Sequence, residues 1–279
     1  EQFGLLNAVW AVVIVLLEVP SGALADILGR KALLVAAAIM MTVEMLLLAV
    51  VPIGSSWVFP ALLLNRILSG AAEAFASGAD EALAFDSLKA VGKDGDWPRV
   101  LERLMQVGGL ATIVAMVTGS LVYSPDLIQA ASDWAGYKTL ITLDDTFRLP
   151  VWLTFFSGCG AILVTLSMRE LPREESLKHV TLLDPFRQTF QTGRWILTNP
   201  MVLIVIAAGV LFDQPIRQLL VVSSQLYARI DIPVLYFGVI SAGTAVIGLL
   251  AASPMRRLAT SQSPKANFRL IFTTVIIGL

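Results

Sequence analysis

Long apolar segments alternate with short charged ones along almost the whole chain. Seven of the apolar segments reach about 20 residues, the length that a helix needs to cross a hydrocarbon core of about 30 Å. They cover residues 3–25, 32–53, 59–85, 104–123, 149–168, 200–222 and 233–252, and an eighth begins near Phe268. Because these segments are continuously apolar, with no period-two alternation, the pattern predicts membrane-spanning helices and not the strands of a barrel.

Composition agrees with a membrane protein. Of the 279 residues, 56% are hydrophobic and 15% are charged, whereas about 25% are charged in a typical soluble protein. One Cys and one His leave no disulfide framework and little from which to build a metal site or a catalytic centre. We therefore expect no cofactor, no metal and no enzymatic activity, and we expect no nucleic-acid partner.

The basic residues predict the sidedness of the helices. Of the 20 Lys and Arg residues, Arg66 and Arg217 fall within spans. Only Lys138, Arg148 and Arg229 fall on the side opposite the turn at residues 30–31. Cytoplasmic loops carry an excess of Lys and Arg. We therefore expect a multi-pass protein of the cell (inner or plasma) membrane, with the turn at residues 30–31 in the cytoplasm and Glu1 on the outer side.

That turn carries the most specific motif of the chain. Residues 22–31 read GALADILGRK, which closely resembles the signature loop of the major facilitator superfamily, G-x-L-A-D-x-x-G-R-K. In that family the loop joins the second and third helices. The resemblance implies an all-α, two-half helical bundle, of which this chain is an incomplete piece covering family helices 2 to 9. It places the N-terminal half at residues 1–168, a cytoplasmic linker at 169–199 and part of the C-terminal half at 200–279.

The resemblance also implies a role for the loop as a conformational latch. Gly22 and Gly29 would permit close packing and a sharp turn, and Asp26 would cap the N-terminus of a neighbouring helix. Arg30 would pair with Asp86 at the cytoplasmic end of the third apolar segment, and Lys31 belongs to the same latch. The alternative is a solvated basic loop that only fixes topology.

A degraded copy of the turn occurs later in the chain. Residues 22–31 align without a gap on residues 248–257, which read GLLAASPMRR. The leading Gly and the two closing bases recur, but Met255 stands in place of Gly29. Together with the number and sidedness of the segments, this repeat favours two halves related by an axis along the membrane normal.

The third apolar segment carries three charges at a regular spacing. Arg66, Glu73 and Asp80 are seven residues apart, so on one helix they would lie within about 40° of one another. Residues 63–74 resemble the fourth-helix motif of drug/proton antiporters, with Ser69 in place of its Gln and Glu73 in place of a small residue. We interpret this face as a pathway for protons or substrate; the alternative is structural ion pairing.

Further charges lie within other apolar segments. Glu18 precedes Pro20 in the first, Glu44 lies midway along the second, and Asp213 and Arg217 are four residues apart in the sixth. Charges at such depths must pair or reach water. We place Glu18, Asp213 and Arg217 in the pathway, with mutual neutralisation of the last two as the alternative. Glu44 is the weakest candidate, because the corresponding family helix tends to lie at the periphery.

The linker contains one ambiguous segment. Aromatic and aliphatic residues alternate with Arg187 and Arg194 between residues 186 and 197. This pattern is typical of an amphipathic helix at a membrane surface. An ordinary solvated loop explains it equally well.

These observations favour a secondary active transporter that works by alternating access. The leading interpretation is proton-coupled efflux of a small molecule by a monomer in the lipid bilayer, with protons and that molecule as its ligands. Uptake of a sugar or another metabolite is the alternative within the same class. A receptor or a purely structural membrane protein is the alternative from a different class.

Overall fold

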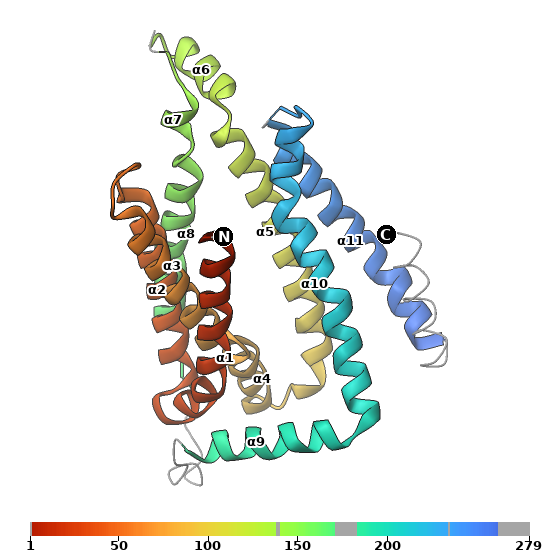
Figure 1. Ribbon diagram of the computed structural model, residues 1–279. Coiled ribbons are helices and arrows are strands. Elements are labelled where there is room, and N and C mark those ends of the chain that lie inside the picture. Colours follow the sequence, from red (N-terminus) through yellow and green to blue (C-terminus); the bar gives the residue numbers. More distant parts are fainter. Residues whose placement is uncertain (1, 138–139, 171–182, 234, 262–279) are drawn as a thin grey trace. The chain divides into compact units, whose positions relative to one another are not determined.

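The protein is helical throughout the part of the chain that the structure describes. The computed structural model describes residues 2–137, 140–170, 183–233 and 235–261, and no β-strand occurs among them (Figure 1). The helices are α1 (Gln2–Leu28), α2 (Arg30–Val50), α3 (Val58–Ala76), α4 (Ala79–Ala90), α5 (Trp97–Tyr123), α6 (Pro125–Trp134), α7 (Leu143–Thr146), α8 (Leu149–Ser167), α9 (Leu183–Thr198), α10 (Pro200–Arg229) and α11 (Leu235–Ser261). A 3-10 turn, Asp94–Asp96, precedes α5.

Five helical stretches among the described residues are long and apolar enough to cross a membrane. They are Gln2–Gly22, Arg30–Val50, Val58–Ala90, Asp94–Tyr123 and Leu143–Ser167. The chain is therefore compatible with a multi-pass membrane protein. The predicted sixth and seventh spans fall in α10 and α11, whereas the predicted eighth lies outside the described residues.

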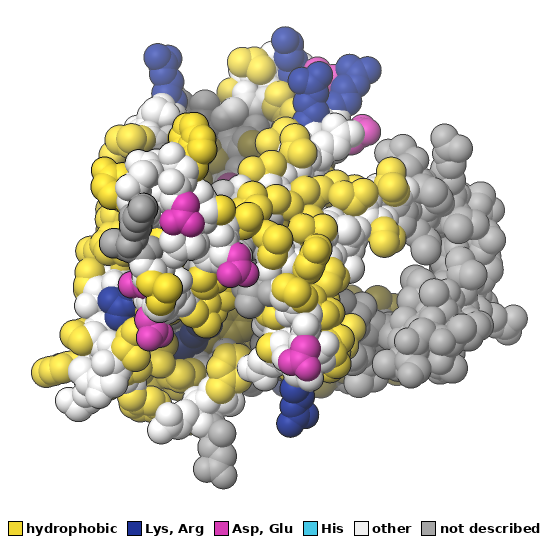
Figure 2. Space-filling model, turned by 90° about the horizontal axis from the view of Figure 1, so that it is seen from above, with side chains coloured by type: hydrophobic (Ala, Val, Ile, Leu, Met, Phe, Trp, Pro, Cys, Tyr) yellow, Lys and Arg dark blue, Asp and Glu magenta, His cyan; other side chains and the backbone are white. Residues whose placement is uncertain are grey.

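The surface of these helices is apolar. Val15 on α1 and Leu163 on α8 are 71% and 70% exposed, and hydrophobic side chains cover much of the face shown in Figure 2. Small residues such as Ala37 and Ala72 are buried between helices instead. Helices that associate in lipid pack through small residues in this way, because burying a large apolar side chain gains little there.

The chain divides into two compact units. Unit 1 comprises Glu1–Arg99 and Phe147–Thr198, and unit 2 comprises Val100–Thr146 and Asn199–Leu279. In unit 1, helix α2 packs against α1, α3, α4 and α8. Glycines allow the closest approaches: a Cβ added at Gly158 of α8 would lie 2.5 Å from Thr42 Oγ1, and one added at Gly70 of α3 would lie 2.8 Å from the Trp10 carbonyl oxygen.

The predicted third span is not one continuous helix. Helix α3 ends at Ala76 and α4 begins at Ala79, with Gly78 between them at a φ of 70°. A left-handed residue interrupts the helix, and glycine adopts this conformation without a steric penalty. The expectation that Asp80 shares one helix face with Arg66 and Glu73 is therefore wrong.

In unit 2, helix α11 packs closely on α5. A Cβ at Gly238 would collide with the Met116 carbonyl oxygen. The Ser120 hydroxyl donates a hydrogen bond of 2.6 Å to the Leu235 carbonyl oxygen. The helix α10 contributes Tyr227, whose ring meets that of Phe237 edge-on at 5.4 Å.

The two copies of the turn motif have different backbones. In the first copy, Gly29 adopts a φ of 107° and separates α1 from α2. In the second copy, α11 continues through residues 248–257 to Ser261. Met255 occupies the position of Gly29, and a side chain disfavours positive φ. The repeat in sequence therefore does not repeat the turn.

The ambiguous linker segment forms a helix. The helix α9 packs against α1 within unit 1 and runs crosswise to it (Figure 1). Arg194, Trp195 and Leu197 are exposed on it. The helical interpretation is confirmed for residues 183–198, and the position of α9 at a membrane surface stays a prediction.

The approach of α8 to α2 generates the first testable prediction. We expect Gly158→Ala to destabilise the protein by about 1–3 kcal/mol, because the new methyl group overpacks against the buried Thr42. The matched control is Gly160→Ala on the same helix, where a Cβ meets nothing within 4 Å. Melting temperatures in detergent measure the difference, and equal temperatures for the two variants would contradict it.

Candidate functional site

The turn between α1 and α2 is held by backbone geometry. The Gly29 N–H donates to the Ala25 carbonyl oxygen at 3.0 Å, and the Gly29 carbonyl accepts from the Leu33 N–H at 3.3 Å. Gly29 occupies the N-cap position of α2 and has no side chain to cap the helix. The first N–H groups of α2 therefore need an acceptor from elsewhere in the fold.

Glu170, just beyond the end of α8, supplies this acceptor. Its Oε1 accepts from the Arg30 N–H at 3.2 Å and its Oε2 from the Lys31 N–H at 2.7 Å. A carboxylate at a helix N-terminus gains from both the hydrogen bonds and the helix dipole. Sequence reasoning missed Glu170, because its partners are 139 and 140 residues away.

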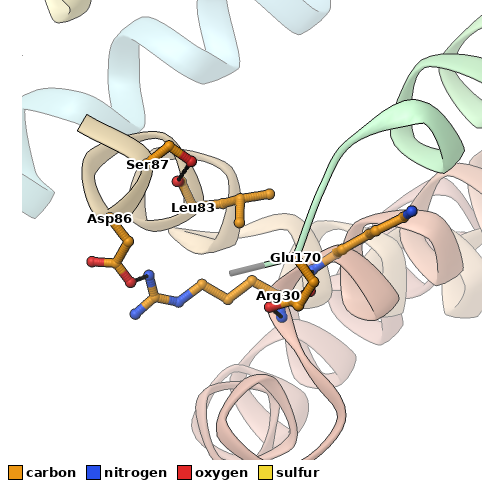
Figure 3. Close-up of polar contacts among 6 residues, drawn as sticks. Arg30, Leu83, Asp86, Ser87 and Glu170 are labelled. Carbon is orange, nitrogen blue, oxygen red and sulfur yellow. Dashed lines mark hydrogen bonds and ion pairs between the residues drawn. The ribbon is translucent and has the colours of Figure 1, made fainter. Parts of the chain in front are cut away.

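The side chain of Arg30 extends from the same turn to α4. Its guanidinium forms an ion pair with the Asp86 carboxylate, and both side chains are partly exposed (Figure 3). Leu34, Ala79 and Leu83 form a small apolar cluster between α2 and α4. The structure thus brings together the two residues that the resemblance paired, and it joins them to Glu170. We call Arg30, Asp86 and Glu170 the turn cluster.

Arg148 caps the opposite end of α2. Its guanidinium donates to the Ala49 carbonyl oxygen at 2.9 Å and to that of Val51, and it stacks on the Phe147 ring at 5.4 Å. The Ala49 carbonyl belongs to the last turn of α2 and Val51 is the C-cap residue, and carbonyls at a helix C-terminus have no partner within the helix. Residues on either side of α8 therefore cap both ends of α2, an acid at the N-terminus and a base at the C-terminus, as the helix dipole favours.

Several other predicted latch and pathway residues are not gathered at this site. A Cβ at Gly22 meets nothing within 4 Å, so close packing does not explain this glycine. The side chains of Asp26, Asp213 and Arg217 lie outside the described residues. For Lys31, the structure gives a contact through its backbone N–H.

The predicted acids around α3 are dispersed. Glu73 and Asp80 are both exposed. Asp80 accepts a 2.8 Å hydrogen bond from the Glu81 N–H in the first turn of α4, and Glu18 on α1 accepts one of 3.3 Å from the Ser77 hydroxyl. None of these contacts involves Arg66, so the structure does not assemble the predicted charged face.

Arg66 lies instead near Glu44, the acid that the sequence-based interpretation considered the weakest candidate. Glu44 is only 5% exposed, and its carboxylate interacts with the Ser69 side chain and with the charge of Arg66 on α3. Asn65, which is 1% exposed, donates from Nδ2 to the Glu44 carbonyl oxygen at 3.3 Å. The expectation that Glu44 is peripheral is wrong, because its side of α2 faces α3. Its position midway along an apolar segment was the signal in the sequence.

Comparisons with known proteins give no family for this chain. It matches no family model, and no curated protein or solved structure is significantly similar to it. Among the described residues, no group of three or more His, Cys, Asp or Glu is placed to hold a metal ion. The geometry of unit 1 is therefore the basis for any functional proposal.

The capping contact of Glu170 generates the second prediction. We expect Glu170→Ala to speed amide hydrogen exchange in the first turn of α2 roughly three- to ten-fold, because the loss of an N-cap acceptor destabilises a helix end. Hydrogen exchange read by mass spectrometry on peptides that begin near Arg30 measures this change. Arg169→Ala, at the exposed neighbouring position, is the control and should leave exchange unchanged. Equal exchange in both variants would refute the capping role.

Proposed function

We propose that this chain belongs to a secondary active transporter of the major facilitator type. In this proposal it resides in the cell membrane as a monomer and exports a small molecule in exchange for protons by alternating access. The turn between α1 and α2 faces the cytoplasm. The observation that carries the proposal is the turn cluster, in which Arg30 and Asp86 pair as the family resemblance implies.

The strength of the cluster suits a contact that opens and closes. Arg30 and Asp86 keep 29% and 44% of their side-chain surface exposed. Pairs of this kind contribute only about 0.2–1 kcal/mol. A transporter must break its latch in every cycle, so a weak pair beside a more firmly capped turn is mechanically useful. A solvated loop that only fixes topology needs no such contacts.

A second transport mode, uptake of a metabolite, uses the same latch and differs only in direction. A receptor or structural protein has no need of a weak, partly exposed ion pair beside a capped turn, or of a buried acid near an arginine. These features support transport over the other class.

The decisive experiment is a substrate panel on the protein reconstituted in proteoliposomes, with and without an imposed pH gradient. We expect at least one small amphipathic molecule to move, and to move faster when the gradient drives protons in the opposite direction. Uptake with the gradient would support the alternative mode. The absence of flux for every class of substrate would reject transport.

The turn cluster generates the third prediction. We expect Arg30→Ala and Asp86→Ala each to slow transport, and the double variant to be no slower than either single one, because both remove the same ion pair. The reversed pair, Arg30→Asp with Asp86→Arg, should recover part of the rate. Lys89→Ala, an exposed base one turn further along α4, is the control. Additive losses with no recovery in the reversed pair would contradict a latch.

A further inference from the structure

We propose that Glu44 is the carboxylate that takes up and releases the coupled proton, with Arg66 as the opposing charge on the neighbouring helix. This inference rests on the proposed transport function and names its proton site. It departs from the sequence-based interpretation, which placed the pathway for protons or substrate on Arg66, Glu73 and Asp80, together with Glu18, Asp213 and Arg217. The observations that carry it are the burial of Glu44, an unpartnered oxygen atom of its carboxyl group and the neighbouring charge of Arg66.

Among the described residues of unit 1, Glu44 is the acid that is buried from solvent. Its side chain is 5% exposed, and the Oε2 atom is buried with no hydrogen-bond partner. Buried carboxylate oxygens are normally satisfied, so an unpartnered one needs an explanation. A site that binds a proton during part of a cycle provides it, because the carboxyl must be able to change its charge without rebuilding its surroundings.

Two opposing effects act on a carboxylate in this position. Removal from water penalises the charged form, whereas a nearby guanidinium and a hydroxyl donor stabilise it. Ser69 supplies the hydroxyl and Arg66 supplies the positive charge, and both residues lie on α3. Glu44 lies on α2. A shift of α3 relative to α2 would therefore change the balance between protonated and ionised Glu44, which is what coupling requires.

The other helices packed against α2 bring little charge to this level. The helix α8 has no acidic or basic residue, and Cys159 is its one titratable group. Arg148 binds the carbonyls at the end of α2, about 8 Å along the axis from Glu44.

The described charges of the other neighbouring helices contact other groups or lie at other levels of α2. On α1, the Glu18 carboxylate contacts the Ser77 hydroxyl, and Asp26 lies in the last turn of that helix. The helix α4 packs on α2 at Leu34, about 15 Å from Glu44 along the axis. Its charged residues are Asp80, Glu81, Asp86 and Lys89. Among the side chains that the structure describes, the charge that acts on the Glu44 carboxylate is that of Arg66.

The first arm of the test measures protonation of Glu44 independently of transport. Dicyclohexylcarbodiimide is an apolar reagent that adds to protonated carboxyl groups and leaves an N-acylurea, which mass spectrometry locates on the peptide. In proteoliposomes of the full protein, we expect labelling of Glu44 to fall as the pH rises. Arg66→Gln should move the half-labelling pH upward by about one to three units, since it removes the charge that stabilises the carboxylate. Arg66→Lys keeps that charge and should stay near the native profile.

A milder variant keeps this arm falsifiable if Arg66→Gln fails to fold. Ser69→Ala removes only a hydroxyl, and it should also move the half-labelling pH upward, by less than the arginine variant. Monodisperse elution in detergent shows which variants are folded. Glu44 unlabelled from about pH 5 to about pH 9, or a half-labelling pH that no variant moves, would overturn the proposal.

The second arm measures coupling. We expect Glu44→Gln to lose at least ten-fold of the transport driven by a pH gradient while it retains substrate exchange without net proton movement. Glu73→Gln and Asp80→Asn are the matched controls, because both acids are exposed, and each should keep gradient-driven transport. Coupling that survives in Glu44→Gln, or disappears only in the controls, would reject Glu44 as the proton site. If the unmodified protein moves no substrate, the transport function fails, while the labelling arm still reports whether Glu44 binds a proton.

Discussion

The antiparallel pairing of α2 with α8 is the contact on which unit 1 depends. Glu170 accepts hydrogen bonds from the first N–H groups of α2, and Arg148 donates to its last carbonyls. Between these ends, Gly158 brings the backbone of α8 close to Thr42. In a bilayer such pairing must come from packing and polar contacts, since apolar side chains gain little by leaving lipid for protein. In the proposed membrane setting, the charges on either side of α8 therefore stabilise the pairing of α2 with α8 where burial of apolar surface does not.

Helix α2 also connects the two polar sites of unit 1. Arg30 starts the helix beside Asp86 and Glu170, and Glu44 lies about 21 Å further along the axis. A rigid helix that is displaced at one end moves along its whole length. A change in the turn cluster would therefore move Glu44 on α2 relative to Arg66 and Ser69 on α3. The proposed latch and the proposed proton site are therefore two levels of one rigid element. We therefore expect a change at the proposed latch to alter the surroundings of the proposed proton site.

Parts of the fold and the site were predictable from local patterns. The lengths of the apolar segments anticipated the long helices, and the GALADILGRK motif anticipated the turn at Gly29 and the approach of Arg30 to Asp86. The break at Ser77–Gly78 also depends on a local feature, the glycine at position 78. The regular spacing of Arg66, Glu73 and Asp80 nevertheless suggested a continuous helix. The spacing of the three charges therefore did not predict whether the helix is continuous, because a single glycine that adopts a left-handed conformation ends it.

The sequence by itself determined the long apolar helices, the turn at Gly29 and the presence of charged groups within apolar segments. These properties depend on side chains within a few residues of one another. Tertiary structure alone decided that Glu170 and Arg148 cap α2 and that Arg66 faces Glu44 instead of the acids on its own segment. Those pairs join residues 22 (Glu44 and Arg66) to 140 (Arg30 and Glu170) positions apart, and which helix faces meet is settled only when all the helices of the unit pack together.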